Sequence, residues 1–131
     1  YGRPDMAYYK FSKKIKENLK IKIYNKGNMS RDMTYIDDII QGIKLAIQAK
    51  NLNNTHEIFN LGNTKPINTM DLLSLIESHY KKKALIEYEE TENEVEVTHA
   101  DIYKAKSMIG YLPKIDFTEG MDNFFSWFDN L

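Results

Sequence analysis

Two arginines are the residues of this 131-residue chain best suited to bind an anion. A guanidinium group stays charged at neutral pH and presents a fixed fork of N–H donors that matches phosphate or carboxylate oxygens. Arg31 follows the turn residues 27–30, and Arg3 precedes Pro4, at the expected start of a helix where anions are favoured. From residue type alone, Arg31 could equally pair with Asp32 or cap a turn, and Arg3 could be solvated.

Other kinds of catalytic or cofactor site are not supported by the sequence. The six glycines are too dispersed for a dinucleotide or Walker-type phosphate loop, and the three histidines share no metal-ligand spacing. There is no cysteine, which excludes disulfides and thiolate metal sites and permits a reducing compartment. We therefore expect this chain to hold neither NAD nor a metal by itself.

The composition is that of one ordinary packed domain, with 42% hydrophobic and 12% aromatic residues. A formal charge of −1 provides no global field to attract nucleic acid or anionic lipid. No apolar run approaches the roughly 20 residues of a membrane span, and the amino end lacks the apolar region of a signal peptide. These observations predict a cytoplasmic protein.

Periodicity along the chain predicts alternating helices and short strands. Apolar residues at every fourth position predict a helix from Pro4 to Leu19, and alternation predicts a strand at 20–24, closed by a turn at 25–28. The acidic residues 89–96 are expected to form an exposed loop. Asp37 or Asp38 is expected to cap a helix that runs to about Ala49, whose apolar residues are Ile39, Ile40, Ile43, Ala46 and Ile47. Further helices are expected at 72–80, capped from 68–71, from Asp101 to Gly110 and at about 118–130. Further strands are expected at 56–61 and 84–88.

This order predicts an α/β fold of the α+β-like kind: a small mixed sheet of about three short strands with four to five helices. Three strands are too few, and their order too mixed, for a free-standing doubly wound sheet. No Pro/Ser-rich linker or internal repeat divides the chain. We expect a lobe appended to another domain.

Six short segments occur in an order and spacing that resemble extended short-chain dehydrogenase/reductase nucleotide-sugar epimerases, in particular the UDP-glucuronate 4-epimerase branch. The segments are Tyr1–Ala7, Ile23–Gly27, Arg31–Asp38, Phe59–Gly62, Ala100–Asp101 and Ile109–Pro113. The resemblance implies that residues 1–131 are the carboxy-terminal nucleotide-sugar-binding domain. The amino-terminal Rossmann domain, which brings the glycine-rich NAD loop and a catalytic Tyr-x-x-x-Lys pair in that family, is absent from this chain.

The resemblance also assigns binding roles to individual residues. It implies that Arg31 contacts the diphosphate, that Lys22 and Tyr24 meet the uracil, and that Arg3 pairs with the sugar C6 carboxylate. For Lys22 and Tyr24, a simple edge strand with a packing aromatic is an equal alternative. Glu94 is expected to accept a hydrogen bond from a ribose hydroxyl.

One departure from the family concerns the acidic residues 89–94. Related epimerases carry a basic or glutamine residue here, whereas four carboxylates near a diphosphate would repel it. Either this loop is turned outward or substrate binding is weaker than in the relatives.

Two functional hypotheses follow. The first is that the chain is the substrate-binding part of an NAD-dependent nucleotide-sugar epimerase, an isomerase of carbohydrate metabolism and polysaccharide biosynthesis. This part would be inactive alone and would need a Rossmann half that binds NAD. A variant of this hypothesis is the corresponding part of a nucleotide-sugar dehydratase. The second is a truncated or split-gene product that acts as a small binding module without catalysis. The expected partners are a UDP-sugar, the missing Rossmann half and a second copy of the chain, with no nucleic acid and no membrane.

Overall fold

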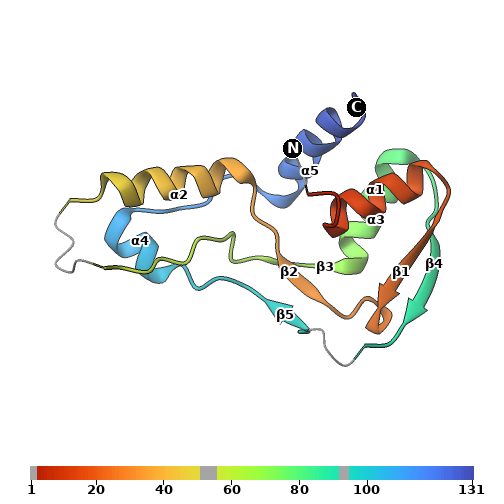
Figure 1. The fold of residues 1–131 in the computed structure, drawn as a ribbon, viewed down its shortest axis with the longest axis horizontal. Coiled ribbons are helices and arrows are strands. Elements are labelled where there is room, and N and C mark those ends of the chain that lie inside the picture. The colour runs from red at the N-terminus through yellow and green to blue at the C-terminus, as the bar shows by residue number, and fades with distance from the viewer. Residues whose placement is uncertain (1–2, 51–55, 92–94) are drawn as a thin grey trace. The chain divides into compact units, whose positions relative to one another are not determined.

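The computed structural model of the protein describes residues 3–50, 56–91 and 95–131 and divides into two compact units (Figure 1). Unit 1 consists of Tyr1–Arg31 and Ile67–Val97, and unit 2 consists of Asp32–Pro66 and Thr98–Leu131. The chain therefore passes between the units three times. These passages fall within three very short strands, which form a sheet in the order β3-β2-β5: β2 (Ser30–Asp32), β3 (Pro66–Asn68) and β5 (Val97–Thr98).

Unit 1 is built on two parallel strands and two helices. Strand β1 (Lys20–Tyr24) pairs with β4 (Leu85–Glu89), and α1 (Ala7–Lys16) contacts both β1 and α3 (Thr69–Tyr80). A short 3-10 helix, η1 (Asn25–Gly27), follows β1. The buried apolar residues of these elements are Phe11, Ile15, Ile21, Ile23, Leu72, Leu73 and Ile76.

The ends of α3 follow the expected capping chemistry. The Asn68 side chain accepts a hydrogen bond from the Met70 backbone N–H at 2.8 Å, and Lys81 adopts the left-handed conformation that ends the helix. Capping from residues 68–71 was predicted from the sequence, and the structure confirms it.

Unit 2 contains α2 (Ile36–Gln48), α4 (Tyr103–Ile109) and α5 (Phe117–Phe128). One buried cluster consists of Ala105, Ile109 and Tyr111, with Leu45 and Ala46 of α2 packed against it. The helix α4 ends as expected, because Gly110 is left-handed. Its start differs from the prediction: Ile102 and not Asp101 is the N-cap, although Asp101 Oδ1 accepts a hydrogen bond from the Tyr103 N–H at 2.9 Å.

The sequence predictions for residues 36–61 need three corrections. The predicted strand at 56–61 is wrong: this segment lies in no strand, because no ladder with another segment forms along it. The helix α2 has Tyr35 at its N-cap, and neither Asp37 nor Asp38 caps it. Its isoleucines do not all face the core, since Ile40 and Ile43 are exposed.

The predicted fold class is confirmed: the described residues contain five α-helices and small sheets that form a mixed α/β structure. They contain five strands in two sheets, where about three strands in one sheet were predicted. Within the described ranges, no helix combines the length and hydrophobicity that a membrane crossing requires.

Candidate functional site

The outer face of β1 presents two of the residues to which the sequence assigned binding roles. Burial alternates along this strand, so that Ile21 and Ile23 point inward while Lys22 and Tyr24 share the exposed face. Lys22 Nζ lies 2.5 Å from Glu89 Oε1 on the neighbouring strand. The hydrogen bond and negative charge of Glu89 raise the pKa of Lys22, which is therefore cationic at neutral pH but already paired.

Arg31 lies in β2, seven residues after Tyr24, and its guanidinium contacts carbonyl groups. Arg31 Nη1 donates to the carbonyl oxygens of Ser30 at 3.0 Å and of Glu96 at 3.3 Å. The Ser30 backbone N–H also donates to the Glu96 carbonyl, at 2.7 Å. The arginine is thus positioned by the backbone at the end of the acidic segment.

Both ends of the acidic segment are attached to the turn that connects β1 and β2. Asn25 exchanges two hydrogen bonds with the Thr91 backbone, at 3.0 and 3.1 Å, and Glu96 is held by Ser30 and Arg31. Glu94 lies outside the described residues. The described residues on either side of it, Thr91 and Glu96, are fixed by these hydrogen bonds to Asn25, Ser30 and Arg31.

Arg3 is engaged by a near neighbour in the chain. Its Nε donates to Asp5 Oδ1 at 3.1 Å and its Nη2 contacts Asp5 Oδ2. This bond lowers the pKa of Asp5 and raises that of Arg3. The Arg3 side chain remains 75% exposed, so an incoming carboxylate could reach it in competition with Asp5.

Unit 2 contains a different kind of polar centre, which the sequence did not reveal. Asp32, the residue after Arg31, accepts hydrogen bonds from the backbone N–H groups of Asn63 (2.9 Å), Thr64 (2.9 Å) and Ala100 (3.1 Å), and from the Thr34 hydroxyl (3.1 Å). Partial burial raises the pKa of Asp32, but these four donors outweigh it and lower the pKa below its usual value. Asp32 therefore fastens three separate segments of unit 2 together.

Asp38 has a similar role at the other end of the same motif. It is 4% exposed, and its two oxygens accept from the backbone N–H groups of Lys114 (2.9 Å) and Ile115 (3.0 Å). The acidic residues of the Arg31–Asp38 motif that the structure buries or half-buries are thus structural. No signal in a single sequence links Asp32 with Ala100, 68 positions away.

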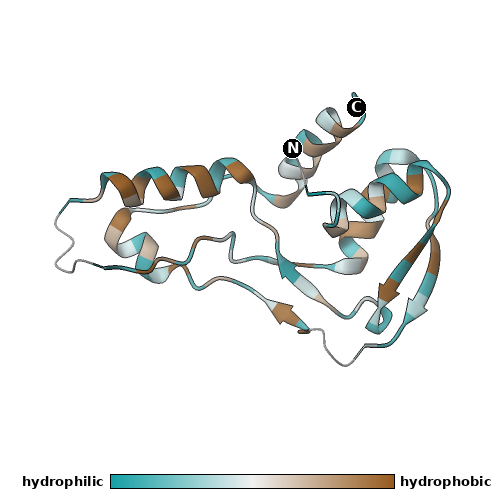
Figure 2. Cartoon of the chain, in the orientation of Figure 1, coloured by the Kyte–Doolittle hydropathy of each residue, from teal (hydrophilic) through white to brown (hydrophobic). Residues whose placement is uncertain are grey.

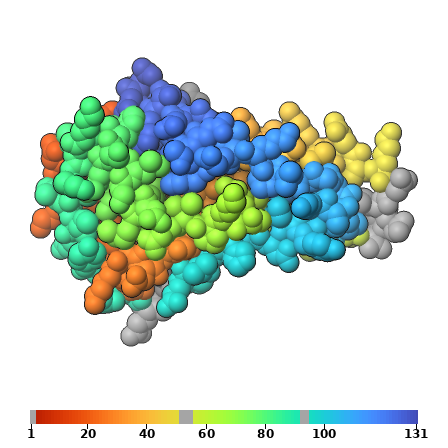
Figure 3. Space-filling view, turned by 180° about the vertical axis from the view of Figure 1, so that it is seen from behind, coloured from red at the N-terminus to blue at the C-terminus, as the bar shows by residue number. Residues whose placement is uncertain are grey.

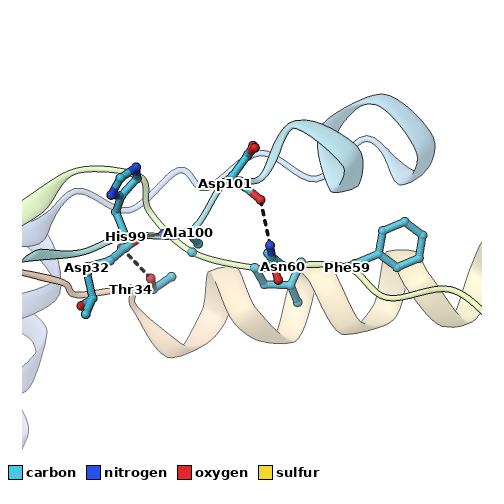
Figure 4. A pocket seen from close by; sticks show the side chains of 10 residues that line it. Asp32, Thr34, Phe59, Asn60, His99, Ala100 and Asp101 are labelled. Atoms are coloured by element: carbon cyan, nitrogen blue, oxygen red, sulfur yellow. Dashed lines mark hydrogen bonds between the residues drawn. The ribbon is translucent and has the colours of Figure 1, made fainter. Parts of the chain in front are cut away.

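A shallow hollow of about 500 Å³ lies beside Asp32 in unit 2 (Figure 4). It is lined by the extended segment from Phe59 to Gly62 and by residues 98–101, and the Asn60 side chain crosses it to donate to the Asp101 carbonyl at 3.3 Å. None of the four predicted site residues that the structure describes lines it. Within the described ranges, no group of three or more acidic, histidine or cysteine side chains is arranged to hold a metal ion.

Comparison with known proteins finds a family model that matches the first part of the chain. The sequence model of the NAD dependent epimerase/dehydratase family matches residues 1–62. The resemblance to nucleotide-sugar epimerases stated from the sequence is confirmed.

Two of the relatives described next are UDP-glucuronate 4-epimerases. The chain is 39% identical, over 96% of its length, to 38% of a UDP-glucuronate 4-epimerase of Thermodesulfobacterium geofontis. It is 46% identical, over 98% of its length, to 39% of an uncharacterised protein of Methanocaldococcus jannaschii. The crystal structure of UDP-glucuronic acid 4-epimerase from Bacillus cereus with UDP-glucuronic acid and NAD matches 99% of the chain and 42% of its own length, at 30% identity and a TM-score of 0.89.

The chain therefore spans about two fifths of the length of these three proteins and resembles that part of them in both sequence and fold.

Proposed function

We propose that this chain is the carboxy-terminal nucleotide-sugar-binding part of an NAD-dependent UDP-sugar 4-epimerase, with UDP-glucuronate as the substrate, and that it is inactive alone. The observation that carries the proposal is the match of nearly the whole chain to a UDP-glucuronate 4-epimerase in both sequence and fold. A UDP-sugar would bind to unit 1, since Arg3, Lys22, Tyr24 and Arg31 all belong to it. Glu94 keeps its predicted contact with a ribose hydroxyl as part of the proposal.

Three of these side chains in unit 1 each suit one part of a UDP-sugar. A flat base can lie against the Tyr24 ring, which is 37% exposed beside a β-strand with polar backbone groups. The Arg31 guanidinium, held by two carbonyls, offers a charged fork to the diphosphate. Arg3 can exchange Asp5 for a sugar carboxylate, because an exposed ion pair is weak.

We expect NAD to bind to the Rossmann half rather than to this chain. The glycines that the structure describes serve packing or turns. A Cβ added to Gly42 would lie 2.7 Å from Leu61, and one added to Gly62 would lie 2.5 Å from Ala100, so neither glycine leaves space for a pyrophosphate. Under this proposal, hydride transfer to NAD depends on residues of the Rossmann half.

The direct test is calorimetric titration of the chain with UDP-glucuronate, UDP-glucose and UDP. We expect Arg31→Ala to weaken UDP binding by roughly 10- to 150-fold, because a charge-assisted pair is lost. Arg31→Lys should recover only part of this loss, since lysine keeps the charge but not the fork.

The control is Lys10→Ala on the exposed surface of α1, which should change the affinity by less than about twofold. Equal losses in Arg31→Ala and Lys10→Ala would contradict the assignment. Turnover of UDP-glucuronate by the purified chain with added NAD would contradict its inactivity.

A further inference from the structure

Seven lysines of unit 1 lie where α1 and α3 end. Three of them are in the last turn of α1, one begins β1, and three directly follow α3. We call these residues the lysine patch: Lys13, Lys14, Lys16, Lys20, Lys81, Lys82 and Lys83. All of them are exposed except Lys14, which is half-buried. Figure 2 shows the hydrophilic teal of much of α1, so this end of unit 1 presents charge to its surroundings.

Hydrogen bonds bring these lysines together from distant parts of the chain. Lys82 Nζ donates to the Lys16 carbonyl oxygen at 2.8 Å, which fixes the segment after α3 to the end of α1. The Leu19 N–H donates to the Lys14 carbonyl oxygen, also at 2.8 Å, and keeps Lys20 close to the same helix end. Figure 3 shows the orange-red atoms of α1 beside the green atoms of α3. The lysine patch therefore belongs to one surface of unit 1.

Carboxylates in these segments do not balance the lysines. Glu77 pairs with Lys83 at 2.7 Å and accepts a hydrogen bond from the Ala84 N–H at 2.8 Å, and these contacts lower the pKa of Glu77. Glu17 follows α1 and Glu87 lies in β4, and both are exposed. Seven lysines against these three carboxylates leave a local positive charge on a chain whose formal net charge is −1. The expectation that the chain has no membrane partner followed from the net charge, which does not describe a local patch.

Two exposed leucines lie among the lysines. Leu19, 50% exposed, directly precedes Lys20, and Leu85, 54% exposed, is the partner of Lys20 in the β1–β4 register. Lysines attract anionic headgroups, and leucines beside them can enter the boundary between headgroups and acyl chains. A nucleic acid would use the lysines and leave both leucines in water. It would also need an open aromatic ring for base stacking, whereas the Lys16 ammonium lies over the Tyr80 ring, 5.9 Å from its centre.

We propose that the lysine patch, together with Leu19 and Leu85, docks unit 1 on the surface of an anionic lipid bilayer. Each lysine that reaches such a surface multiplies the affinity by about fivefold, so several together give peripheral binding without a membrane span. The two leucines lie at the start of β1 and β4, whereas Tyr24 ends β1. A bilayer on the patch and a base on the Tyr24 ring therefore use opposite ends of this strand. The inference does not rest on the proposed function, because none of the patch lysines is a proposed UDP contact.

The test is co-sedimentation of the whole chain with vesicles of equal parts phosphatidylglycerol and phosphatidylcholine, and with vesicles of phosphatidylcholine alone. At about 0.1 M salt, where the screening length is about 10 Å, we expect the mixed vesicles to bind at least about 100-fold more tightly than the neutral ones. This preference should disappear near 1 M salt, where the screening length is about 3 Å. Equal binding to both kinds of vesicle would overturn the inference.

Substitution of lysines by glutamine measures the contribution of the patch. Lys13→Gln/Lys20→Gln/Lys81→Gln should weaken binding to the mixed vesicles by about 100-fold, as three independent losses of about fivefold each predict. The matched control makes the same change in charge at three exposed lysines of unit 2, in Lys44→Gln/Lys65→Gln/Lys106→Gln. It should change the affinity by less than about threefold. Equal losses in the two triple variants would show that only the overall charge matters, and would overturn the inference.

The leucines separate a lipid surface from another anionic partner. Leu19→Gln/Leu85→Gln should weaken vesicle binding by about tenfold and leave its salt dependence unchanged, because these side chains contribute apolar burial and no charge. Unchanged vesicle binding in this variant, with equally tight binding of the chain to duplex DNA, would overturn the inference in favour of a nucleic acid. Titration with UDP in the absence of vesicles tests the proposed function separately, and its outcome leaves the lipid-docking surface as it stands.

Discussion

Several charged side chains of the two units make different kinds of contact. In unit 1, charges meet each other at the surface, as in Lys22–Glu89 and Arg3–Asp5. In unit 2, Asp32 and Asp38 accept hydrogen bonds from backbone N–H groups of distant segments. An exposed ion pair costs little to exchange, whereas a carboxylate that satisfies several backbone donors is fixed in place. The surface of unit 1 is therefore suited to an incoming anion, and unit 2 is suited to hold a scaffold.

The strongest test of this difference is Asp32→Ala. The substitution leaves three backbone donors and one hydroxyl without their acceptor, and we expect it to lower the free energy of unfolding by about 3–5 kcal/mol. Urea unfolding followed by the fluorescence of Trp127, which belongs to unit 2, measures the loss. Asp122→Ala on the exposed surface of α5 is the control and should cost less than about 0.5 kcal/mol. Similar losses of unfolding free energy in both variants would contradict the structural role of Asp32.

The lowered pKa of Asp32 also predicts a pH dependence. A carboxyl whose pKa is lower in the folded state stabilises the protein above its unfolded pKa of about 3.9, and this contribution disappears as the pH falls through the folded value. We expect unfolding midpoints to fall on acidification below about pH 4. The Asp32→Ala variant should show a shallower fall over the same range, and parallel curves for the two proteins would contradict the prediction.

A smaller but still structural effect is expected at Gly62. An added Cβ would lie 2.5 Å from the Ala100 Cβ and 2.7 Å from Asp32 Oδ2, so Gly62→Ala must displace the segments that Asp32 joins. We expect a loss of about 1–3 kcal/mol in urea unfolding. Gly120→Ala in α5 is the comparison, since its Cβ would lie no closer than 3.2 Å to its nearest neighbour, Tyr35 Cδ2, and alanine favours a helix. A loss at Gly120 as large as that at Gly62 would show that the packing argument fails.

The sequence predicted the parts of this molecule that local chemistry determines. Helix periodicity, the Asn68 cap and the left-handed Gly110 depend on residues a few positions apart, and the structure confirms them. The outer face of β1 followed from alternation alone. The binding roles of Arg3, Lys22, Tyr24, Arg31 and Glu94 came from the family resemblance and stay predictions.

Long-range features could not be predicted in the same way. The hydrogen bonds from backbone N–H groups to Asp32 and Asp38 join positions 31 to 77 residues apart. From sequence alone, an acidic residue near the start of a helix is interpreted as its cap, because its distant partners are not known. The strand predicted at 56–61 fails for a related reason: alternation indicates which side chains face inward, but a strand also requires a neighbour. Helix α2 carries apolar residues on both of its faces, and only the structure shows that Leu45 and Ala46 pack on the Ala105 cluster while Ile40 and Ile43 are exposed.

Arg3 tests whether the exchangeable pairs of unit 1 select the sugar. The protein for this test is the Methanocaldococcus jannaschii relative in which this chain replaces the matching segment. In it, Arg3→Ala should weaken the binding of UDP-glucuronate by about 10-fold. The substitution removes a charge-assisted pair, and the loss is limited because Asp5 already competes for the guanidinium. UDP-glucose, which carries a neutral group at that position, should change by less than about threefold. Calorimetric titration of both sugars gives the comparison, and equal losses would assign Arg3 to the phosphate or to structure.

The smallest expected effect concerns Glu89, which forms an ion pair with Lys22. Glu89→Gln removes a negative charge 2.5 Å from the Lys22 ammonium, so this group becomes available to an anion while repulsion of the diphosphate falls. Because the pair is exposed, we expect UDP to bind only up to about fivefold more tightly, with the gain disappearing near 1 M salt, where the screening length is about 3 Å. Glu17→Gln, an exposed change beyond the end of α1, should leave the affinity unaltered. Weaker UDP binding in Glu89→Gln would mean that Glu89 positions Lys22 for the ligand instead of competing with it, and unit 1 would then hold its charges as firmly as unit 2 does.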